Sequence, residues 1–198
     1  MYLWWVGSIA ARVRILYVGT GKDCIMDYQA YYDRYIDVVN SIDLDDVDKA
    51  VQTIKQAYQV FVCGNGGSSA IASHLVNDLV KIAGVRAVSL ADNVPLITAI
   101  ANDIRYSEIF DWQLKRSMTK EDVLVCISGS GMSENVLRAA YEATRIGARV
   151  ITLTGADGGE LYVWSDVPIH LMGAGMTLAE SAFSFICHMI AEGVIDEE

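Results

Sequence analysis

Two side chains capable of acid/base chemistry follow a glycine-rich turn in the first half of the chain. His74 and Asp78 lie four residues apart in "SSAIASHLVNDLVK", so they share one face if the segment is a helix. This spacing suits two ligands of one metal ion or a positioned acid/base pair. A surface hydrogen bond between a histidine and an aspartate has the same spacing, so the pair alone leaves its role open.

A second carboxylate and a second histidine lie in the apolar stretch "LAESAFSFICHMIAEGV". Glu180 and His188 are eight residues apart, which is about 12 Å along a helix axis. They cannot easily meet at one ion from a single straight helix. If all four residues form one site, either the last helix starts or bends near Glu180, or the site joins residues of different subunits. His188 could also be an ordinary core histidine.

Glycine-rich polar loops follow three β-rich runs: "GNGGSS" follows "QVFVC", "SGSGMSEN" follows "DVLVCI", and "TGADGG" follows "ARVITL". The first loop has Ser69 where a dinucleotide fingerprint needs glycine, and no Gly-Lys-Ser/Thr follows, which disfavours a nucleotide. Asn65, Gly66 and Gly67 form a turn that lets a ligand approach the backbone. Ser68 either helps to hold an anion at a helix N-terminus or is a simple N-cap.

The second loop favours a phosphate ester. Ser128, Ser130 and Ser133 fall within six residues, at the entrance to a predicted helix, where hydroxyls and free amides can converge on one anion. Gly129 and Gly131 allow the backbone to curl around it. A single helix cap does not need three serines.

These loops require a scaffold that brings strand ends together. Two leading helices are predicted in "YQAYYDRYIDVVNSI" and "DLDDVDKAVQTIKQAY", and then strands alternate with helices. The pattern predicts an α/β three-layer sandwich with a mainly parallel five-stranded sheet. In such a sheet ligands bind at the carboxyl ends of the strands.

Composition limits the remaining choices. The 198 residues suit one domain, and the net charge of -10 without a basic cluster argues against nucleic acid. The four cysteines form no CxxC pair, so we interpret Cys63 and Cys126 as buried strand residues in a reducing, cytoplasmic compartment. Residues 1–25 are apolar and interrupted by arginines, too short for stable membrane insertion. We treat them as an N-terminal extension of uncertain status, with Met26 as a possible natural start, and residues 26–198 as one domain.

The segments "CGNGGSSAIASH", "ISGSGMSENV" and "VITLTGADGG", in this order, resemble the sugar isomerase (SIS) domain, and specifically the phosphoheptose isomerases. The resemblance implies a flavodoxin-like fold, a homotetramer with sites between subunits, and zinc. It also implies aldose–ketose isomerisation of sedoheptulose 7-phosphate to D-glycero-D-manno-heptose 7-phosphate, for the heptose of lipopolysaccharide or capsule.

Carried over by position, the resemblance gives each candidate residue a role. Phosphate would be held by Ser68, Ser128, Ser130 and Ser133, and the sugar would be contacted by Asn65 and Asp103. Gly66, Gly67, Gly129 and Glu180 would be further substrate-binding residues. His74, Asp78, Glu180 and His188 fall at the family's zinc ligands and acid/base pair. Asp78 replaces a glutamate of the best-known members, and Glu180 replaces a glutamine.

The reaction fits these residue types, because moving a proton between adjacent carbons through an enediol needs a base and an acid. We expect Asp78 to act as the base and His188 as the acid, although the reverse is possible. The alternatives are a non-catalytic SIS scaffold, a sugar-phosphate-binding protein, and an isomerase of a different phosphosugar.

Overall fold

The computed structural model describes residues 17–18 and 25–195. A short antiparallel pair, β1 (Tyr17–Val18) and β2 (Ile25–Met26), leads into two helices, α1 (Tyr28–Asn40) and α2 (Leu44–Lys55). The two predicted leading helices are therefore confirmed. Apart from these two short strands, the predicted extension lies outside the described residues.

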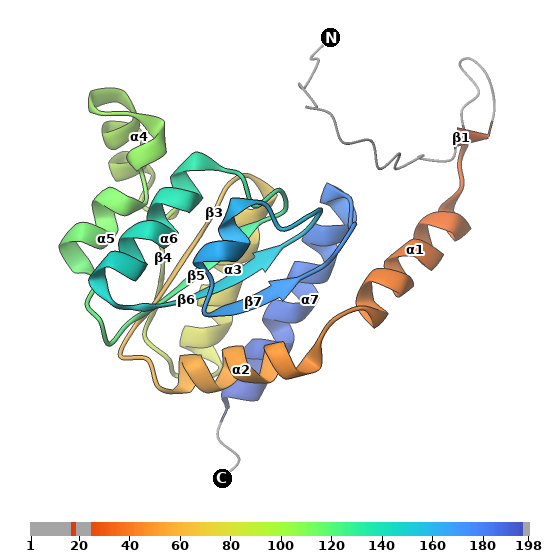
Figure 1. Ribbon diagram of the computed structural model, residues 1–198, viewed down its shortest axis with the longest axis horizontal. Helices are drawn as coiled ribbons and strands as arrows, with labels where there is room; N and C mark the ends of the chain where they lie inside the picture. The colour runs from red at the N-terminus through yellow and green to blue at the C-terminus, as the bar shows by residue number, and fades with distance from the viewer. Residues whose placement is uncertain (1–16, 19–24, 196–198) are drawn as a thin grey trace.

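A five-stranded sheet forms the centre of the molecule (Figure 1). Its strands are β3 (Val60–Gly64), β4 (Ala87–Ser89), β5 (Val123–Ser128), β6 (Arg149–Thr154) and β7 (Val167–His170). Every neighbouring pair is parallel, and the spatial order is β4-β3-β5-β6-β7. This is the flavodoxin-like order, with the switch point between β3 and β5. The prediction of a five-stranded parallel sheet is confirmed.

Helices and short 3₁₀ turns connect these strands. They are α3 (Gly67–Lys81), α4 (Val94–Asp103), η1 (Tyr106–Glu108), α5 (Asp111–Ser117), α6 (Glu134–Ile146), η2 (Glu160–Trp164) and α7 (Met176–Val194). None of the helices in the described ranges is both long and apolar enough to cross a membrane.

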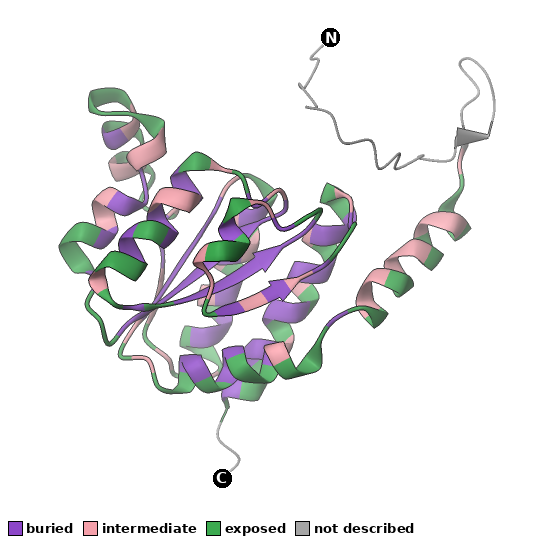
Figure 2. Ribbon diagram, viewed as in Figure 1, coloured by how far each residue is buried: buried purple, intermediate pink, exposed green. Residues whose placement is uncertain are grey.

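Strand alternation divides the core into two clusters, one on each face of the sheet. Val60 and Val62 point to the face covered by α2, α3 and α7. Phe61 and Cys63 point to the opposite face, which is covered by α4, α5 and α6. Figure 2 shows the strands buried between the two helical layers, whose outer surfaces are exposed. The sheet is thus buried on both faces, which explains the continuously apolar strand sequences.

Helix α1 differs from the others because it contains no buried residue. It projects away from the sheet (Figure 1). Its side chains Tyr28, Tyr32 and Ile36 are exposed by 77%, 58% and 36%, respectively. At spacings of four residues these side chains share one face of the helix, so the helix presents an apolar stripe that the single chain does not cover.

Candidate active site

A cavity of about 280 Å³ lies at the carboxyl edge of the sheet, beside the switch point. Its lining residues come from the loops after β3 and β5 and from the start of α7: Asn65, Gly66, Gly67, Ser68, Ile127, Ser128, Gly129, Ser130, Ser133, Met176 and Glu180. All of the predicted substrate-binding residues except Asp103 are in this set. The three segments meet because the carboxyl ends of parallel strands share one edge.

The first loop is shaped by glycines. A Cβ on Gly64 would lie 2.8 Å from the backbone of Ser68, so the strand can turn into α3 this tightly only without a side chain. Gly66 is the N-cap of α3, with a φ of 57° and no side-chain capping bond. Ser68 lies inside the first turn and is 4% exposed. The simple N-cap role considered for Ser68 is therefore wrong.

The second loop is held by its own hydroxyls and by the neighbouring loop. Ser128 Oγ accepts a hydrogen bond from the Gly131 amide at 3.2 Å, and Ser130 Oγ accepts one from the Met132 amide at 3.2 Å. Ser133 is the N-cap of α6 but makes no side-chain capping bond. Backbone bonds also attach the loop to the segment after β6. The hydroxyl of Ser133 thus lines the cavity at a helix N-terminus.

The electrostatics of the cavity favour an anion through dipoles rather than through cationic side chains. The N-termini of α3 and α6 both open at its lining residues, and free amides there attract negative charge. The described residues that line it include no lysine or arginine. Glu180 contributes a carboxylate, which lies so close to Gly67 that a Cβ there would be 2.5 Å from its Oε1. The wall of the cavity beside Gly67 therefore carries the carboxylate of Glu180.

A group of two histidines and one aspartate lies between α3 and α7. His74 Nε2 is 3.2 Å from Asp78 Oδ2, and His188 Nε2 is 3.7 Å from the same oxygen. The two Nε2 atoms are 3.1 Å apart, and the rings meet edge to face. The side chains of His74 and His188 are exposed by 55% and 50%, whereas that of Asp78 is exposed by 9%. The proposed core position of His188 is therefore wrong, and the group can be reached from solvent.

Packing between α3 and α7 brings these residues together. Leu75 and Leu79 on α3 are fully buried in the same cluster as Phe183 and Ile186 on α7. Each helix has its apolar stripe against the sheet and its partner, which leaves the adjoining polar positions at the rim of the contact. The helix spacing of four residues then puts His74 and Asp78 on the rim that faces His188.

The structure separates two predicted residues from the positions expected for them. Glu180 lies at the cavity, two turns along the continuous α7 from His188, and is not part of the histidine–aspartate group. Asp103 ends α4, is exposed, and accepts a hydrogen bond from Asn102. In one chain, therefore, Glu180 lines the cavity but is not beside the other three proposed metal ligands, and Asp103 does not line the cavity, so their assigned roles stay predictions.

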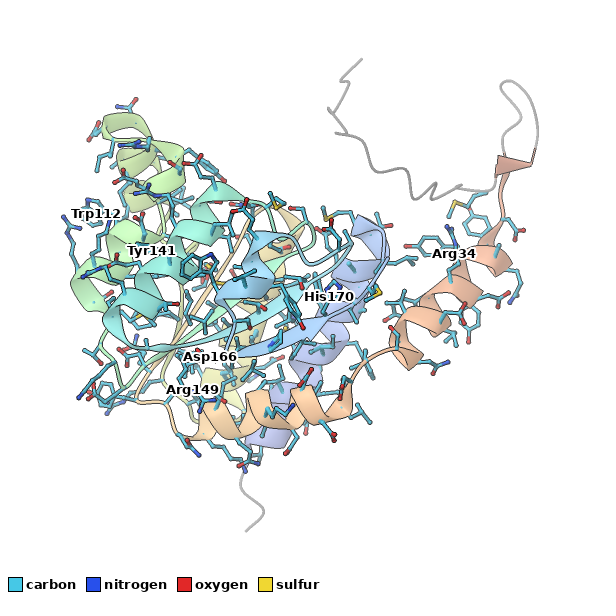
Figure 3. The ribbon with its side chains drawn as sticks, viewed as in Figure 1. Arg34, Trp112, Tyr141, Arg149, Asp166 and His170 are labelled. Carbon is cyan, nitrogen blue, oxygen red and sulfur yellow. The ribbon has the colours of Figure 1, made fainter. Side chains whose placement is uncertain are left out.

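His170 and the buried cysteines belong neither to the cavity lining nor to the histidine–aspartate group. His170, on β7 (Figure 3), is hydrogen-bonded to Thr154 at 3.0 Å, and its ring meets that of Tyr162 edge to face. Burial, together with the charge of Asp78, raises the pKa of Cys187 to about 12. Cys187 is consequently a neutral thiol at physiological pH. Cys63 and Cys126 are buried in the strands, as predicted.

The donor set of the histidine–aspartate group fits a divalent transition metal. Two imidazole nitrogens and a carboxylate oxygen are common zinc ligands, and such atoms about 2.0–2.1 Å from a tetrahedral ion are about 3.3 Å from one another. The three observed separations are 3.1, 3.2 and 3.7 Å. These residues thus form a possible metal-binding group that leaves one tetrahedral position for a ligand.

Three residues that line the cavity or hold its lining were not identified from the sequence. Met176 lines the cavity, and its Sδ would be 2.5 Å from a Cβ on Gly129. Asn135 and Tyr106 both hydrogen-bond to Asn65, at 2.8 and 2.9 Å. Asn135 follows the serine-rich loop directly and could have been suspected for that reason. Tyr106 carried no signal, because only the tertiary fold brings it to Asn65.

Comparison with known proteins agrees with this geometry. A family model described as SIS domain matches residues 27–155. A phosphoheptose isomerase of Helicobacter pylori (strain P12) is 38% identical over 124 residues, which are 60% of this chain and 65% of that protein. The match therefore spans just under two thirds of that relative. A phosphoheptose isomerase of Clostridium acetobutylicum is 32% identical over 170 residues, covering 83% of this chain and 84% of the relative.

Solved structures show the same similarity. A phosphoheptose isomerase from Neisseria gonorrhoeae superimposes with a TM-score of 0.78 at 27% identity, over 84% of this chain and 96% of the other. One from Francisella tularensis gives a TM-score of 0.78 at 27% identity, over 85% of this chain and 96% of the other. The similarity thus includes the whole layered sheet and its loops.

Proposed function

Because the chain belongs to the SIS domain family, we propose that it is a phosphoheptose isomerase that converts sedoheptulose 7-phosphate to D-glycero-D-manno-heptose 7-phosphate. The observation that carries the proposal is the pairing of two features: a cavity with hydroxyls and helix N-termini, and a histidine–aspartate group farther along the same helix. The first suits a phosphate ester, and the second suits proton transfer. The heptose would serve surface-glycan synthesis.

The spacing of these two features supports a long sugar phosphate. His74 lies six residues beyond Ser68 on α3, about 9 Å along the helix axis. An extended seven-carbon chain spans about 7–8 Å from C1 to C7 at carbon–carbon bond lengths near 1.5 Å. A phosphate on C7 held by the serines therefore leaves C1 and C2 within reach of the histidine–aspartate group.

In this proposal Asp78 and His188 divide the proton transfers. Asp78 takes the proton from C1, and His188 gives a proton to the carbonyl oxygen on C2, which yields the enediol. Asp78 then returns its proton to C2 as His188 takes one from the C1 hydroxyl, which forms the aldehyde. The assignment follows exposure, because the buried position of Asp78 keeps its carboxylate beside the two exposed imidazoles. The reverse assignment uses the same atoms.

In a metal-bound form of the site, we propose His74, Asp78 and His188 as zinc ligands, with Glu180 joining only if it comes from a neighbouring subunit. An imidazole nitrogen that binds zinc has no proton to give, so the zinc-ligand role and the acid role of His188 are alternatives. When bound, zinc would supply Lewis acidity to a carbonyl oxygen. We also propose a cytoplasmic homotetramer with sites between subunits. The apolar stripe on α1 supports assembly into an oligomer. The free thiols Cys63, Cys126 and Cys187 support a reducing, cytoplasmic compartment.

The proposal is tested by following formation of the aldose phosphate from sedoheptulose 7-phosphate, with added zinc and after chelation. Asp78→Asn and His188→Asn should each reduce kcat at least 100-fold, as is usual for loss of a general acid or base. Asp48→Asn, at an exposed position on α2, and His170→Asn are the matched controls.

Full turnover by both Asp78→Asn and His188→Asn would refute the assignment of these residues. No turnover by the intact parent protein, with and without zinc, would refute the isomerase itself and favour a scaffold or another phosphosugar. Turnover that survives chelation would assign the group to acid/base chemistry alone.

A further inference from the structure

We infer that Tyr106 and Asn135 are positioning residues that lock the side-chain amide of Asn65, so that Asn65 meets the sugar only as a hydrogen-bond donor. The inference deepens the proposed function and rests on a sugar phosphate binding in the same cavity. Asn65 lines that cavity directly after β3. Its amide could in principle present either an oxygen or a nitrogen to a ligand.

Asn135 determines which way the amide pair is oriented. Its side chain is 2% exposed, and its Oδ1 accepts a hydrogen bond from the backbone amide of Val136 at 3.0 Å. A backbone N–H can only donate, so this contact, which the Val136 amide shares with the carbonyl of Ser133 at 3.0 Å, orients the oxygen of Asn135 toward Val136. Its Nδ2 must then face Asn65 Oδ1, and the two amides exchange reciprocal hydrogen bonds of 2.8 Å.

Tyr106, in η1, completes the lock. Its hydroxyl donates to Asn65 Oδ1 at 2.9 Å. A carbonyl oxygen has two lone pairs, and Asn135 and Tyr106 use both. Asn65 Nδ2 has one hydrogen directed at Asn135 and one left over. The remaining hydrogen is the only hydrogen-bonding capacity that the Asn65 side chain has for a ligand.

An ion-pair cluster ties Tyr106 to the helix that carries Asn135. Arg138 on α6 is 3.4 Å from Glu108 Oε1 in η1 and 3.0 Å from Asp111 Oδ2 in α5. Glu108 is also paired with Arg105, at 2.9 Å. These contacts hold η1 against α6. Tyr106 and Asn135 consequently approach Asn65 from one connected unit.

The lock has a chemical consequence for ligand choice. Asn65 can donate one hydrogen bond to a sugar oxygen but can accept none from a sugar hydroxyl. A polyhydroxylated chain offers such an oxygen next to its phosphorylated end. Inorganic phosphate at the serines does not need this donor. The lock therefore favours the sugar portion of the ligand rather than its phosphate.

The test compares binding of sedoheptulose 7-phosphate and inorganic phosphate by calorimetry. Tyr106→Phe removes only the hydroxyl of a residue that is 56% exposed, so folding should be unaffected. We expect the Kd for the sugar phosphate to rise about five- to tenfold, the usual effect of one lost hydrogen bond. The Kd for inorganic phosphate should change less than twofold. In turnover, KM should rise by the same factor with kcat nearly constant.

Asn135→Asp is the second variant, because its Oδ1 can still accept from Val136 while the other oxygen cannot donate to Asn65. Asn135→Asp should also weaken binding of the sugar phosphate while leaving binding of inorganic phosphate nearly unchanged. Tyr58→Phe is the matched control, since Tyr58 is 62% exposed and precedes β3 at the opposite end of the strand.

The inference would be overturned if Tyr106→Phe loses affinity equally for both ligands, or if it loses affinity for neither. If the parent binds the sugar phosphate but does not turn it over, selective loss would still support the lock while the isomerase proposal fails. If the parent turns over the sugar phosphate and the kinetics of Tyr106→Phe are unchanged, the isomerase proposal holds and the lock fails. A parent that binds neither ligand would overturn both.

Discussion

At the scale of single residues, the serine-rich loop depends on backbone positions that admit no side chain. Gly131 has a φ of 62°, and a Cβ there would collide with the carbonyl oxygen of Gly158. Its own carbonyl accepts a hydrogen bond from Leu161 at 3.0 Å. The loop that holds Ser128 to Ser133 is therefore packed directly on the loop after β6.

Gly131→Ala should lower the free energy of unfolding by about 3 kcal/mol or more. The cost of a side chain at positive φ and the cost of its collision with the backbone of Gly158 both contribute. Gly173→Ala is the control, since its φ is 73° but nothing lies within 4 Å of its Cβ position. That change should cost only about 1–2 kcal/mol. Urea unfolding measures both, and equal losses would contradict the collision.

A second residue-scale prediction concerns Met176, whose thioether covers Gly129. Gly129→Ala should destabilise the protein because the Met176 side chain must move. Combined with Met176→Ala, the change should cost less than the sum of the two single changes, with a coupling of about 0.5–1 kcal/mol. Strict additivity in a double-mutant cycle of unfolding free energies would show that the two residues do not interact.

At the scale of elements, β3 and β5 place two thiols side by side in the core. Cys63 Sγ and Cys126 Sγ are 3.6 Å apart on register partners of the two strands. Burial, with a smaller contribution from Cys63, raises the pKa of Cys126 well above its usual value of 9.0. Cys126 therefore stays protonated in the folded protein.

The sign of the resulting pH dependence follows from linkage. Above about pH 9 the unfolded thiol loses its proton while folded Cys126 keeps it, so the folded state binds more protons and stability falls as pH rises. Between pH 8 and pH 10 this group should remove about 1 kcal/mol. Cys126→Ala should show a correspondingly smaller loss in urea unfolding at the two pH values. Identical losses would contradict the pKa shift.

At the scale of the whole molecule, the exposed apolar stripe of α1 is the feature that one chain leaves unexplained. Tyr28, Tyr32 and Ile36 share a face, and a stripe of this kind on a projecting helix is typical of an interface. The proposed tetramer would cover it.

Tyr32→Asp should reduce the assembly to a smaller species, because a charge on a buried interface without a partner is costly. Light scattering coupled to gel filtration would measure this mass. Asp33→Asn, on the same helix, serves as the control. If the parent is monomeric, or if the Tyr32→Asp protein keeps the parent's mass, α1 is not the interface.

The sequence by itself determined the layered sheet, the two leading helices and nearly all of the cavity lining. These depend on local rules: apolar runs for buried strands, glycine and serine at strand ends, and the common edge of parallel strands. His74 and Asp78 were recognisable for the same reason, since a spacing of four residues is a property of one helix.

Only the tertiary structure decided which distant residues meet. Packing of α7 on α3 brought His188 to Asp78 but left Glu180 at the cavity, two turns away. The approach of η1 to β3 brought Tyr106 to Asn65, although 41 residues separate them. Such contacts depend on how whole helices are rotated and shifted against the sheet. That rotation is fixed by the sum of many core contacts, so no local pattern in the chain records it.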